Sequence, residues 1–201
     1  MRDPVFHLDV LFAGSSIFEQ WRRAETLVPG ASMRNAAIGG TETFDWLRTL
    51  GPLLAGHRPR VFCLYLGSND VGRGRDIEDI LTNTTRLLDI ARETSPATRV
   101  LYFSIIRSAD KAARYADLDR VERTVREREA SDAMLSFVDI NPVFFASTED
   151  ALVAYEANRM RNDLFLDDRI HLTEPAYDAL SAFAKPVIAE ELHTSLNAHP
   201  R

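Results

Sequence analysis

The sequence has very little cysteine and no long hydrophobic run. Its single cysteine, Cys63, excludes an intrachain disulfide framework and a multi-cysteine zinc or iron–sulfur site. The longest apolar runs, Val10–Ala13 and Val61–Leu66, are far shorter than the ~20 residues that a membrane-spanning helix needs. Residues 1–14 contain no apolar core of the length found in secretory signals. We therefore expect a soluble cytoplasmic protein without integral membrane association, and leave open whether a signal was removed.

Positive charge is also in short supply. The chain has 24 Lys and Arg residues against 30 Asp and Glu residues, a net charge of −6. Such a chain is a poor candidate for binding nucleic acid through bulk electrostatics. The sequence also lacks Gly-x-Gly-x-x-Gly, a Walker loop, His-Glu-x-x-His and the Gly-x-Ser-x-Gly nucleophile elbow. We therefore expect no cofactor, no metal and no nucleic-acid partner.

The composition is that of an ordinary globular domain. Hydrophobic residues make up 45% of the 201 residues and charged residues 27%, which excludes a disordered chain, a collagen and a coiled coil. A chain of this length buries about 70% of the surface that its unfolded form exposes, so it needs no disulfide or metal for stability. We expect residues 1–201 to form a single domain.

Short apolar runs alternate with longer stretches of helical periodicity. The predicted strands are Leu8–Ala13, Ser32–Ile38, Arg60–Leu66, Arg99–Ile106 and Leu135–Ile140. The predicted helices are Ile17–Leu27, Thr43–Leu54, a helix from the N-cap Asp76 to Ser95, Ala112–Met134, and a last helix capped by Thr173 and kinked at Pro186. Strands that alternate with helices predict one α/β domain with a five-stranded parallel sheet.

Ligands of parallel sheets bind beyond the carboxyl ends of the strands, so the segments there are candidates for a site. Ser16 lies where the first strand turns into a helix, and a serine is a weak nucleophile until a base takes its proton. His171 precedes the last helix and is a plausible base. Asp168, three residues earlier, is placed to accept a proton from the other imidazole nitrogen.

Acyl transfer also needs hydrogen-bond donors for the developing oxyanion. Gly40 follows the second strand and can bring its N–H close to a substrate because it has no Cβ. Asn69 follows the third strand and offers a side-chain amide, and the N–H of Ser16 is a third candidate. Each segment alone is more often a simple turn; it is the ordered set of four that indicates catalysis.

These four segments resemble blocks I, II, III and V of the SGNH hydrolases, also called GDSL-type esterases and lipases. The stretches Phe18–Trp21 and Leu172–Tyr177 resemble the family as well, so the similarity covers nearly the whole chain. The resemblance is strongest to small GDSL-like acylhydrolases related to platelet-activating-factor acetylhydrolase. It implies a three-layer α/β/α, flavodoxin-like fold. It also implies Ser16 as nucleophile, His171 as base and Asp168 as its partner, with Ser16, Gly40 and Asn69 forming the oxyanion hole.

The sequence departs from the family pattern at two positions. Ser15 replaces the aspartate of Gly-Asp-Ser-Leu, and Ala37 stands where many relatives carry glycine. The family register favours Ser16 over Ser15 as nucleophile, and the Asp-x-x-His spacing favours Asp168 over Asp167. Neither departure removes a candidate catalytic side chain, although Ala37 has the potential to alter the turn that aims Gly40.

Other conspicuous residues have plainer interpretations. Cys63 lies in the most apolar strand and is expected to be a small buried hydrophobe. Residues 120–129 alternate in charge, which is typical of a solvent-facing helix with i,i+4 pairs. The remaining histidines are expected to be surface or structural residues: His7, His57, His193 and His199.

The sequence thus predicts a serine esterase that hydrolyses small carboxylic esters, with short acyl or acetyl groups favoured. Carbohydrate deacetylation, lysophospholipid hydrolysis and thioester hydrolysis use the same chemistry and stay open. A flavodoxin-like binding module without turnover is the alternative from another class. Val71–Arg75 and Thr148–Asn162 are expected to shape the pocket. The oligomeric state is not predicted.

Overall fold

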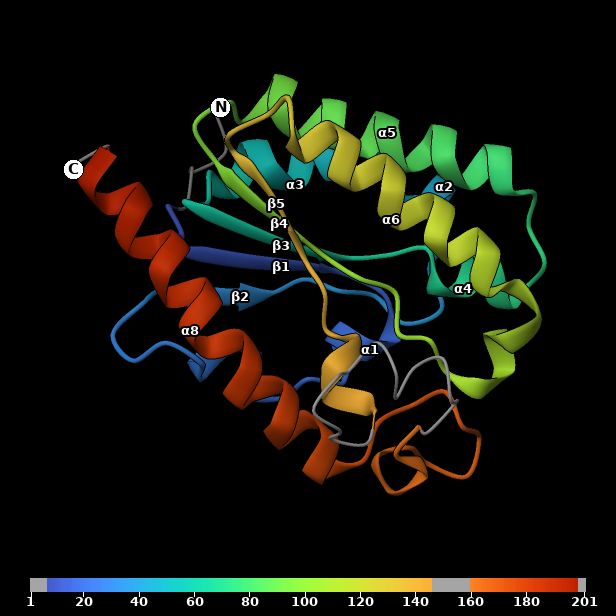
Figure 1. The fold of residues 1–201 in the computed structure, drawn as a ribbon. Coiled ribbons are helices and arrows are strands. Elements are labelled where there is room, and N and C mark those ends of the chain that lie inside the picture. Colours follow the sequence, from blue (N-terminus) through green and yellow to red (C-terminus); the bar gives the residue numbers. More distant parts are fainter. Residues whose placement is uncertain (1–6, 146–159, 199–201) are drawn as a thin grey trace.

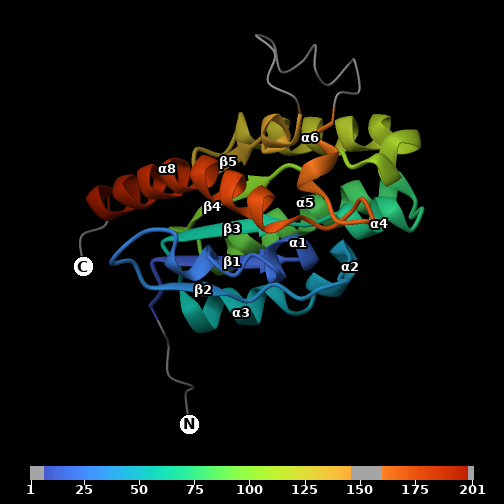
Figure 2. The same ribbon diagram turned by 90° about the horizontal axis from the view of Figure 1, so that it is seen from below.

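A five-stranded parallel sheet forms the centre of the protein in a computed structural model that describes residues 7–145 and 160–198. The strand order is β2-β1-β3-β4-β5, and each neighbouring pair is parallel. Figure 2 shows this order from one edge to the other. The strands are β1 (Val10–Gly14), β2 (Met33–Asn35), β3 (Val61–Tyr65), β4 (Arg99–Phe103) and β5 (Leu135–Val138). The predicted sheet is confirmed, and each of its five strands is shorter than expected.

Helices cover both faces of the sheet. The α-helices are α1 (Ser16–Glu19), α2 (Thr43–Trp46), α3 (Leu50–His57), α4 (Ser68–Gly72), α5 (Ile77–Thr94), α6 (Tyr115–Glu129) and α8 (Glu174–Ala198). Short 3₁₀ turns are η1 (Ala24–Thr26), η2 (Ala109–Arg114), η3 (Asn141–Phe144) and η4 (Asn162–Leu164). In Figure 1, α3, α5 and α6 lie above the sheet, and α1 and α8 lie below it. The predicted three-layer α/β/α architecture is confirmed.

Alternate strand residues supply two separate cores. In β1, Val10 and Phe12 belong to the core beneath α1 and α8, whereas Leu11 and Ala13 belong to the core beneath α3, α5 and α6. Because every residue of β1 and β3 is buried, these strands show no apolar–polar alternation in sequence. Cys63 is fully buried in β3, and burial raises the pKa of its thiol. The prediction of a buried, apolar Cys63 is confirmed.

Two predicted helices are interrupted. Residues 17–27 form α1 and η1 rather than one helix; between them the Trp21 indole donates to Ser181 of α8. Residues 43–54 form α2 and α3, since Pro52 has no N–H and cannot continue a helix from α2, but is accommodated in the first turn of α3. The predicted N-cap is confirmed: the Asp76 side chain accepts a hydrogen bond from the Glu78 N–H at 2.8 Å.

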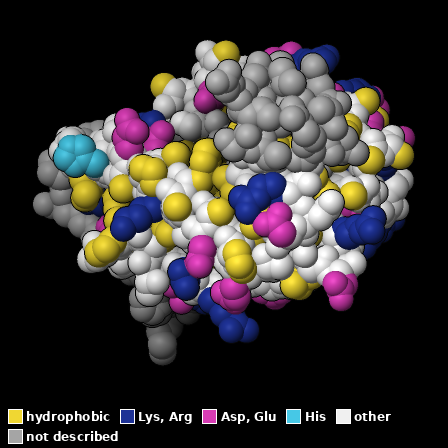
Figure 3. All heavy atoms as spheres, turned by 60° about the horizontal axis from the view of Figure 1, so that its bottom comes forward, with side chains coloured by type: hydrophobic (Ala, Val, Ile, Leu, Met, Phe, Trp, Pro, Cys, Tyr) yellow, Lys and Arg dark blue, Asp and Glu magenta, His cyan; other side chains and the backbone are white. Residues whose placement is uncertain are grey.

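The long charged helix is shorter than predicted. It comprises η2 and α6 and ends at Glu129 rather than Met134. Its charged surface is confirmed: Arg126 pairs with Glu122 in the i,i+4 arrangement at 2.9 Å. No helix within residues 7–145 and 160–198 has the length and apolar character to cross a bilayer. On the face shown in Figure 3, Lys and Arg side chains stand among Asp and Glu side chains rather than in one basic patch.

Candidate active site

Ser16 is the first residue of α1 and comes two residues after β1 ends. The close approach of β1 and β3 requires glycine at position 14, because a Cβ there would lie 2.0 Å from the Tyr65 carbonyl oxygen. The Ser15 N–H donates to that same carbonyl at 3.2 Å, which fixes the turn into α1. Ser15 is therefore buried, whereas Ser16 is partly exposed. The turn presents Ser16, not Ser15, to solvent.

His171 lies in a small hairpin that precedes α8. Phe165 and Leu172 pair as an antiparallel bridge, and the Leu166 N–H donates to the His171 carbonyl at 2.8 Å. Arg169, between Asp168 and His171, has a φ of 58°, in the left-handed region that side chains rarely adopt. This turn folds the Asp168 carboxylate back onto the backbone, where its Oδ1 accepts from the N–H groups of Ile170 and His171, each at 2.9 Å.

The three side chains form a continuous hydrogen-bonded chain. His171 Nε2 lies 3.0 Å from Ser16 Oγ, and His171 Nδ1 lies 2.6 Å from Asp168 Oδ2. The hydrogen bond from His171 is the main cause that lowers the pKa of the Asp168 carboxyl to about 2. An ionised carboxylate at Nδ1 favours a proton on that nitrogen, which leaves Nε2 of a neutral imidazole as the acceptor facing Ser16.

Helix α8 ties the histidine side of this chain to the serine side. The buried Tyr177 hydroxyl, one turn into α8, donates to the Ile17 carbonyl at 2.9 Å. The indole of Trp21 makes a second link to the same helix through Ser181. Residues 155 positions apart in the chain are therefore held together by packing outside the site itself.

Gly40 lies in a turn after β2. The Thr41 N–H donates to the Ile38 carbonyl across this turn, and Gly40 has a φ of 76°, a conformation that favours glycine. Among the described residues, the N–H groups of Ser16 and Gly40 donate no hydrogen bond to the protein. Both donors therefore remain free for a ligand.

Asn69 lies in α4, directly after β3, and reaches the same turn. Its Nδ2 donates to the Thr41 carbonyl at 2.9 Å, and an amide nitrogen carries a second hydrogen. The neighbouring Asp70 is buried and accepts from the N–H of Thr43 at 3.0 Å and from its hydroxyl at 2.5 Å. Burial raises the pKa of Asp70, although the hydrogen bonds from Thr43 act in the opposite direction.

Two ion pairs beside this turn were not anticipated from the sequence. Glu42 pairs with Arg73 at 2.7 Å and with Arg75 at 2.9 Å. Both arginines belong to the predicted pocket segment Val71–Arg75, whereas most of the other segment, Thr148–Asn162, lies outside the described residues. The residue types alone gave no signal that these arginines would pair with residue 42.

The other histidines keep their plainer interpretations where the structure describes them. His7 and His193 are exposed, and His57 Nδ1 lies 2.9 Å from the Leu53 carbonyl. His199 lies outside the described residues. Within residues 7–145 and 160–198, no three His, Cys, Asp or Glu side chains cluster as metal ligands would.

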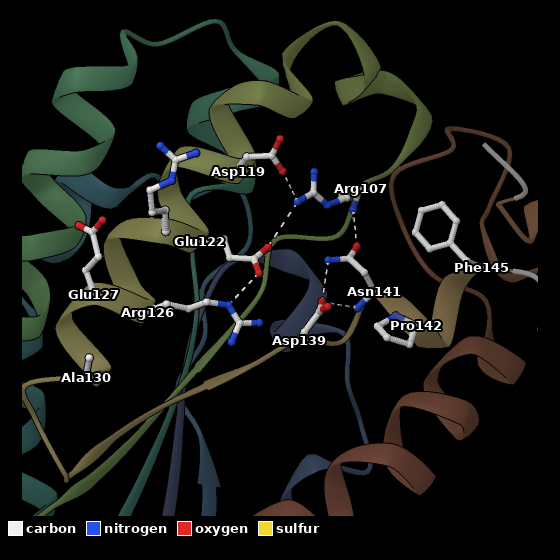
Figure 4. Close-up of a pocket in the computed structure, with 11 residues that line it drawn as sticks. Arg107, Asp119, Glu122, Arg126, Glu127, Ala130, Asp139, Asn141, Pro142 and Phe145 are labelled. Carbon is white, nitrogen blue, oxygen red and sulfur yellow. Dashed lines mark hydrogen bonds and ion pairs between the residues drawn. The ribbon is translucent and has the colours of Figure 1, made fainter. Parts of the chain in front are cut away.

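A cavity of about 720 Å³ lies elsewhere, between α6 and the segments that follow β4 and β5 (Figure 4). Four of its charged groups pair with one another: Arg107 with Asp119 at 2.5 Å, and Arg126 with Glu122 at 2.9 Å. None of the five candidate residues is among its described lining residues. The described lining residues are Arg107, Asp119, Glu122, Arg123, Arg126, Glu127, Ala130, Asp139, Asn141, Pro142 and Phe145.

Comparison with known proteins agrees with this fold. The family model of the GDSL-like lipase/acylhydrolase family matches residues 12–179. The chain belongs to the GDSL-like lipase/acylhydrolase family. As a member of this family it is an ester hydrolase, which confirms the resemblance drawn from the four sequence blocks. No curated protein matches the chain significantly.

Several solved structures share the fold of this GDSL-like acylhydrolase. A Streptococcus pneumonia structure named for platelet activating factor is 21% identical, with a TM-score of 0.75 over 92% of this chain and 85% of that one. A GDSL-like lipase from Bacteroides thetaiotaomicron is 17% identical, with a TM-score of 0.71 over 94% and 92%. A carbohydrate esterase of family 3 from Talaromyces cellulolyticus is 18% identical, with a TM-score of 0.67 over 93% and 99%.

Proposed function

We propose that the protein is a serine esterase that hydrolyses small carboxylic esters through an acyl-enzyme. The observation that carries this proposal is the chain of contacts from Asp168 through His171 to Ser16: 2.6 Å between Asp168 Oδ2 and His171 Nδ1, and 3.0 Å between His171 Nε2 and Ser16 Oγ, the atoms between which the proton would pass. Such distances are those expected of a nucleophile, its base and the group that orients the base.

The reaction follows from these positions. His171 Nε2 takes the Ser16 proton as Oγ bonds to the ester carbonyl carbon, and the carbonyl oxygen becomes an oxyanion. The N–H groups of Ser16 and Gly40 and the Asn69 amide stabilise that oxyanion. The bond to the alcohol oxygen then breaks, and His171 gives its proton to the departing alcohol. Water, deprotonated by His171, attacks the acyl-enzyme in the same way and releases the acid and the serine.

Exposed apolar side chains support an ester with an apolar group beside the carbonyl. Ile38 is 56% exposed, two residues before Gly40, and Leu166 is 48% exposed, two residues before Asp168. Both lie on the loops that carry candidate site residues. We favour short acyl groups; the fold shared with a family 3 carbohydrate esterase makes acetylated sugars the second substrate class to test.

The test compares Ser16→Ala with Ser15→Ala, because the two serines are adjacent and only Ser16 contacts His171. We expect turnover of p-nitrophenyl acetate to fall by several orders of magnitude in Ser16→Ala. We expect Ser15→Ala to keep turnover within about tenfold if it folds, since Ser15 touches neither His171 nor Asp168. A fluorophosphonate probe should label the wild-type protein and not Ser16→Ala. Equal turnover in wild type and Ser16→Ala would refute the proposal.

The substrate class is a separate measurement. Esters from acetyl to lauroyl and a set of acetylated sugars would be compared by kcat/KM. A preference for lauroyl over acetyl would refute the expectation of a short acyl group. A preference for acetylated sugars over simple acetyl esters would place the protein among carbohydrate deacetylases.

A further inference from the structure

Arg73 connects the turn that carries Gly40 with the segment that carries Asn69. It lies four residues after Asn69, just beyond α4. Its Nη1 donates to the Gly40 carbonyl at 3.0 Å and to Glu42 Oε1 at 2.7 Å. Its Nη2 lies 3.7 Å from the position that a Cβ on Gly40 would occupy. The guanidinium is therefore packed directly against the backbone of Gly40.

The backbone at Gly40 needs a contact that fixes it, because glycine has no Cβ to restrict its φ and ψ angles. A residue without Cβ has access to both signs of φ, and the φ of 76° at Gly40 is one of several it can adopt. The Gly40 N–H makes no hydrogen bond within the described residues, so its direction depends on the bonds around it, of which the Thr41 bond to the Ile38 carbonyl closes the turn. The carbonyl on the other side of the same Cα is held by Arg73.

Glu42 keeps Arg73 in place. Its carboxylate is 12% exposed and accepts from both Arg73 and Arg75. Glu42 also forms a capping box with Asp45, whose Oδ2 accepts from the Glu42 N–H at 2.8 Å. Glu42 is thus fixed at the N-terminus of α2, and its carboxylate in turn fixes the position of the Arg73 guanidinium.

Arg75 binds Glu42 as Arg73 does, so it serves as the matched control for Arg73. Its Nε donates to Glu42 Oε2 at 2.9 Å and its Nη2 to Oε1 at 3.2 Å. The two arginines share the same acid, are similarly exposed, and lie two positions apart. Only Arg73 has a hydrogen bond to Gly40.

We propose that Arg73 is a positioning residue for ester hydrolysis: by holding the Gly40 carbonyl it keeps the Gly40 N–H aimed at the oxyanion. This inference rests on the proposed function, in which Gly40 is an oxyanion donor. Arg73 does not touch the reacting atoms. Arg73 acts through the direction of one backbone N–H. Its removal should therefore weaken stabilisation of the transition state, which lowers kcat, rather than substrate binding.

The experiment measures kcat and KM for Arg73→Met, Arg75→Met and Arg73→Lys with p-nitrophenyl acetate and with the matching thionoester. Loss of one oxyanion donor costs about 10²–10³-fold in kcat, so a misdirected donor should cost about 10–100-fold. We expect that fall in Arg73→Met, with KM within about twofold, and a clearly smaller fall in kcat in Arg75→Met. Arg73→Lys should recover part of kcat, since an ammonium can still donate to a carbonyl.

The thionoester separates positioning from a general structural effect. Sulfur is a weaker hydrogen-bond acceptor than oxygen, so a reaction through a thiolate-like intermediate depends less on the oxyanion donors. Arg73→Met should therefore lose more activity on the oxygen ester than on the thionoester. Thermal unfolding of each variant shows whether it is folded.

The outcomes separate this proposal from the proposed function. Equal losses in Arg73→Met and Arg75→Met, equal losses on both esters, or a change in KM alone would overturn the role of Arg73. If Arg73→Met does not fold, Arg73→Lys decides by the same ester comparison. Undiminished turnover in Ser16→Ala would instead overturn the proposed function, whatever the arginine variants do.

Discussion

Replacing Asp168 with asparagine tests whether the carboxylate orients His171 or merely lies beside it. Asp168 makes three contacts: its Oδ1 accepts two backbone N–H groups, and its Oδ2 faces His171 Nδ1. Asparagine keeps an oxygen for the backbone N–H groups. It presents an NH₂ group to Nδ1, which requires Nδ1 to accept and moves the imidazole proton to Nε2. The histidine then faces Ser16 with a donor instead of an acceptor.

The expected loss in kcat is large because the wrong tautomer removes the base. The same substitution in the serine-protease triad costs about 10⁴-fold. At about 1.36 kcal/mol per tenfold, this corresponds to about 5 kcal/mol of transition-state stabilisation. Stability should change by less than about 1 kcal/mol, because the Asp168 side chain is 45% exposed and water screens the pair.

The control is Asp167→Asn, which changes the same residue type one position earlier, where the side chain makes no hydrogen bond or ion pair within the described residues. Its kcat for p-nitrophenyl acetate at pH 8 should stay within about twofold of wild type. A loss below threefold in Asp168→Asn would refute the reasoning, as would a larger loss in Asp167→Asn than in Asp168→Asn.

The lowered pKa of Asp168 allows a second test, in which the stability of wild type and Asp168→Asn is compared as a function of pH. Its folded value of about 2 lies below the ordinary value of 3.8, so its contribution to stability is present above pH 3.8 and is lost as pH falls toward 2. Wild type and Asp168→Asn should therefore differ in melting temperature at pH 7 and converge near pH 2. A difference in melting temperature that stays the same from pH 7 to pH 2 would show that Asp168 titrates at an ordinary pKa.

Two further predictions concern the stability of the fold. Gly14→Ala should abolish soluble folded protein, because its Cβ would lie 2.0 Å from the Tyr65 carbonyl oxygen; Gly30→Ala, with positive φ but nothing within 4 Å, should lose only about 1–2 kcal/mol in urea unfolding. A folded, stable Gly14→Ala would contradict the close approach. Lys111 is buried beside Asp110, and burial lowers its pKa below 10.5, so its charging cost in the folded state disappears as pH rises toward 10.5. The unfolding free energy of wild type should rise more between pH 8 and 10.5 than that of Lys111→Met, and parallel curves would contradict this.

The sheet could be predicted because strands that are buried on both faces appear in the sequence as apolar runs without polar alternation. The run Val61–Tyr65 is apolar without alternation, and the structure buries every residue of it. The candidate triad could be predicted for a related reason: Ser16 follows β1 directly, and the Asp-x-x-His spacing is local. Each of these signals is contained within a few residues of sequence and does not depend on knowing how distant segments pack, and it is their order along the chain that indicates catalysis.

Helix boundaries and the support of the site depend on such distant packing. The predicted helix over residues 17–27 has continuous helical character, but the structure breaks it where the Trp21 indole reaches Ser181, 160 positions away. The bond from Arg73 to the Gly40 carbonyl spans 33 positions and leaves no periodicity in the sequence. Arg73 and Arg75 are the same residue type in the same short loop, so composition cannot say which one contacts Gly40.

The backbone N–H groups of Ser16 and Gly40, which have no partner within the described residues, depend on neighbouring hydrogen bonds for their direction. Folded proteins pair nearly all of their buried polar groups, and each pairing also fixes the direction of the group. The N–H groups of Ser16 and Gly40 lack internal partners among the described residues, so their directions must be set by the groups next to them. For Ser16 that group is the Ser15 N–H bound to Tyr65, and for Gly40 it is the carbonyl bound to Arg73. A donor left free for an oxyanion is thus held by a hydrogen bond one peptide away, and removing that bond should affect kcat before it affects stability.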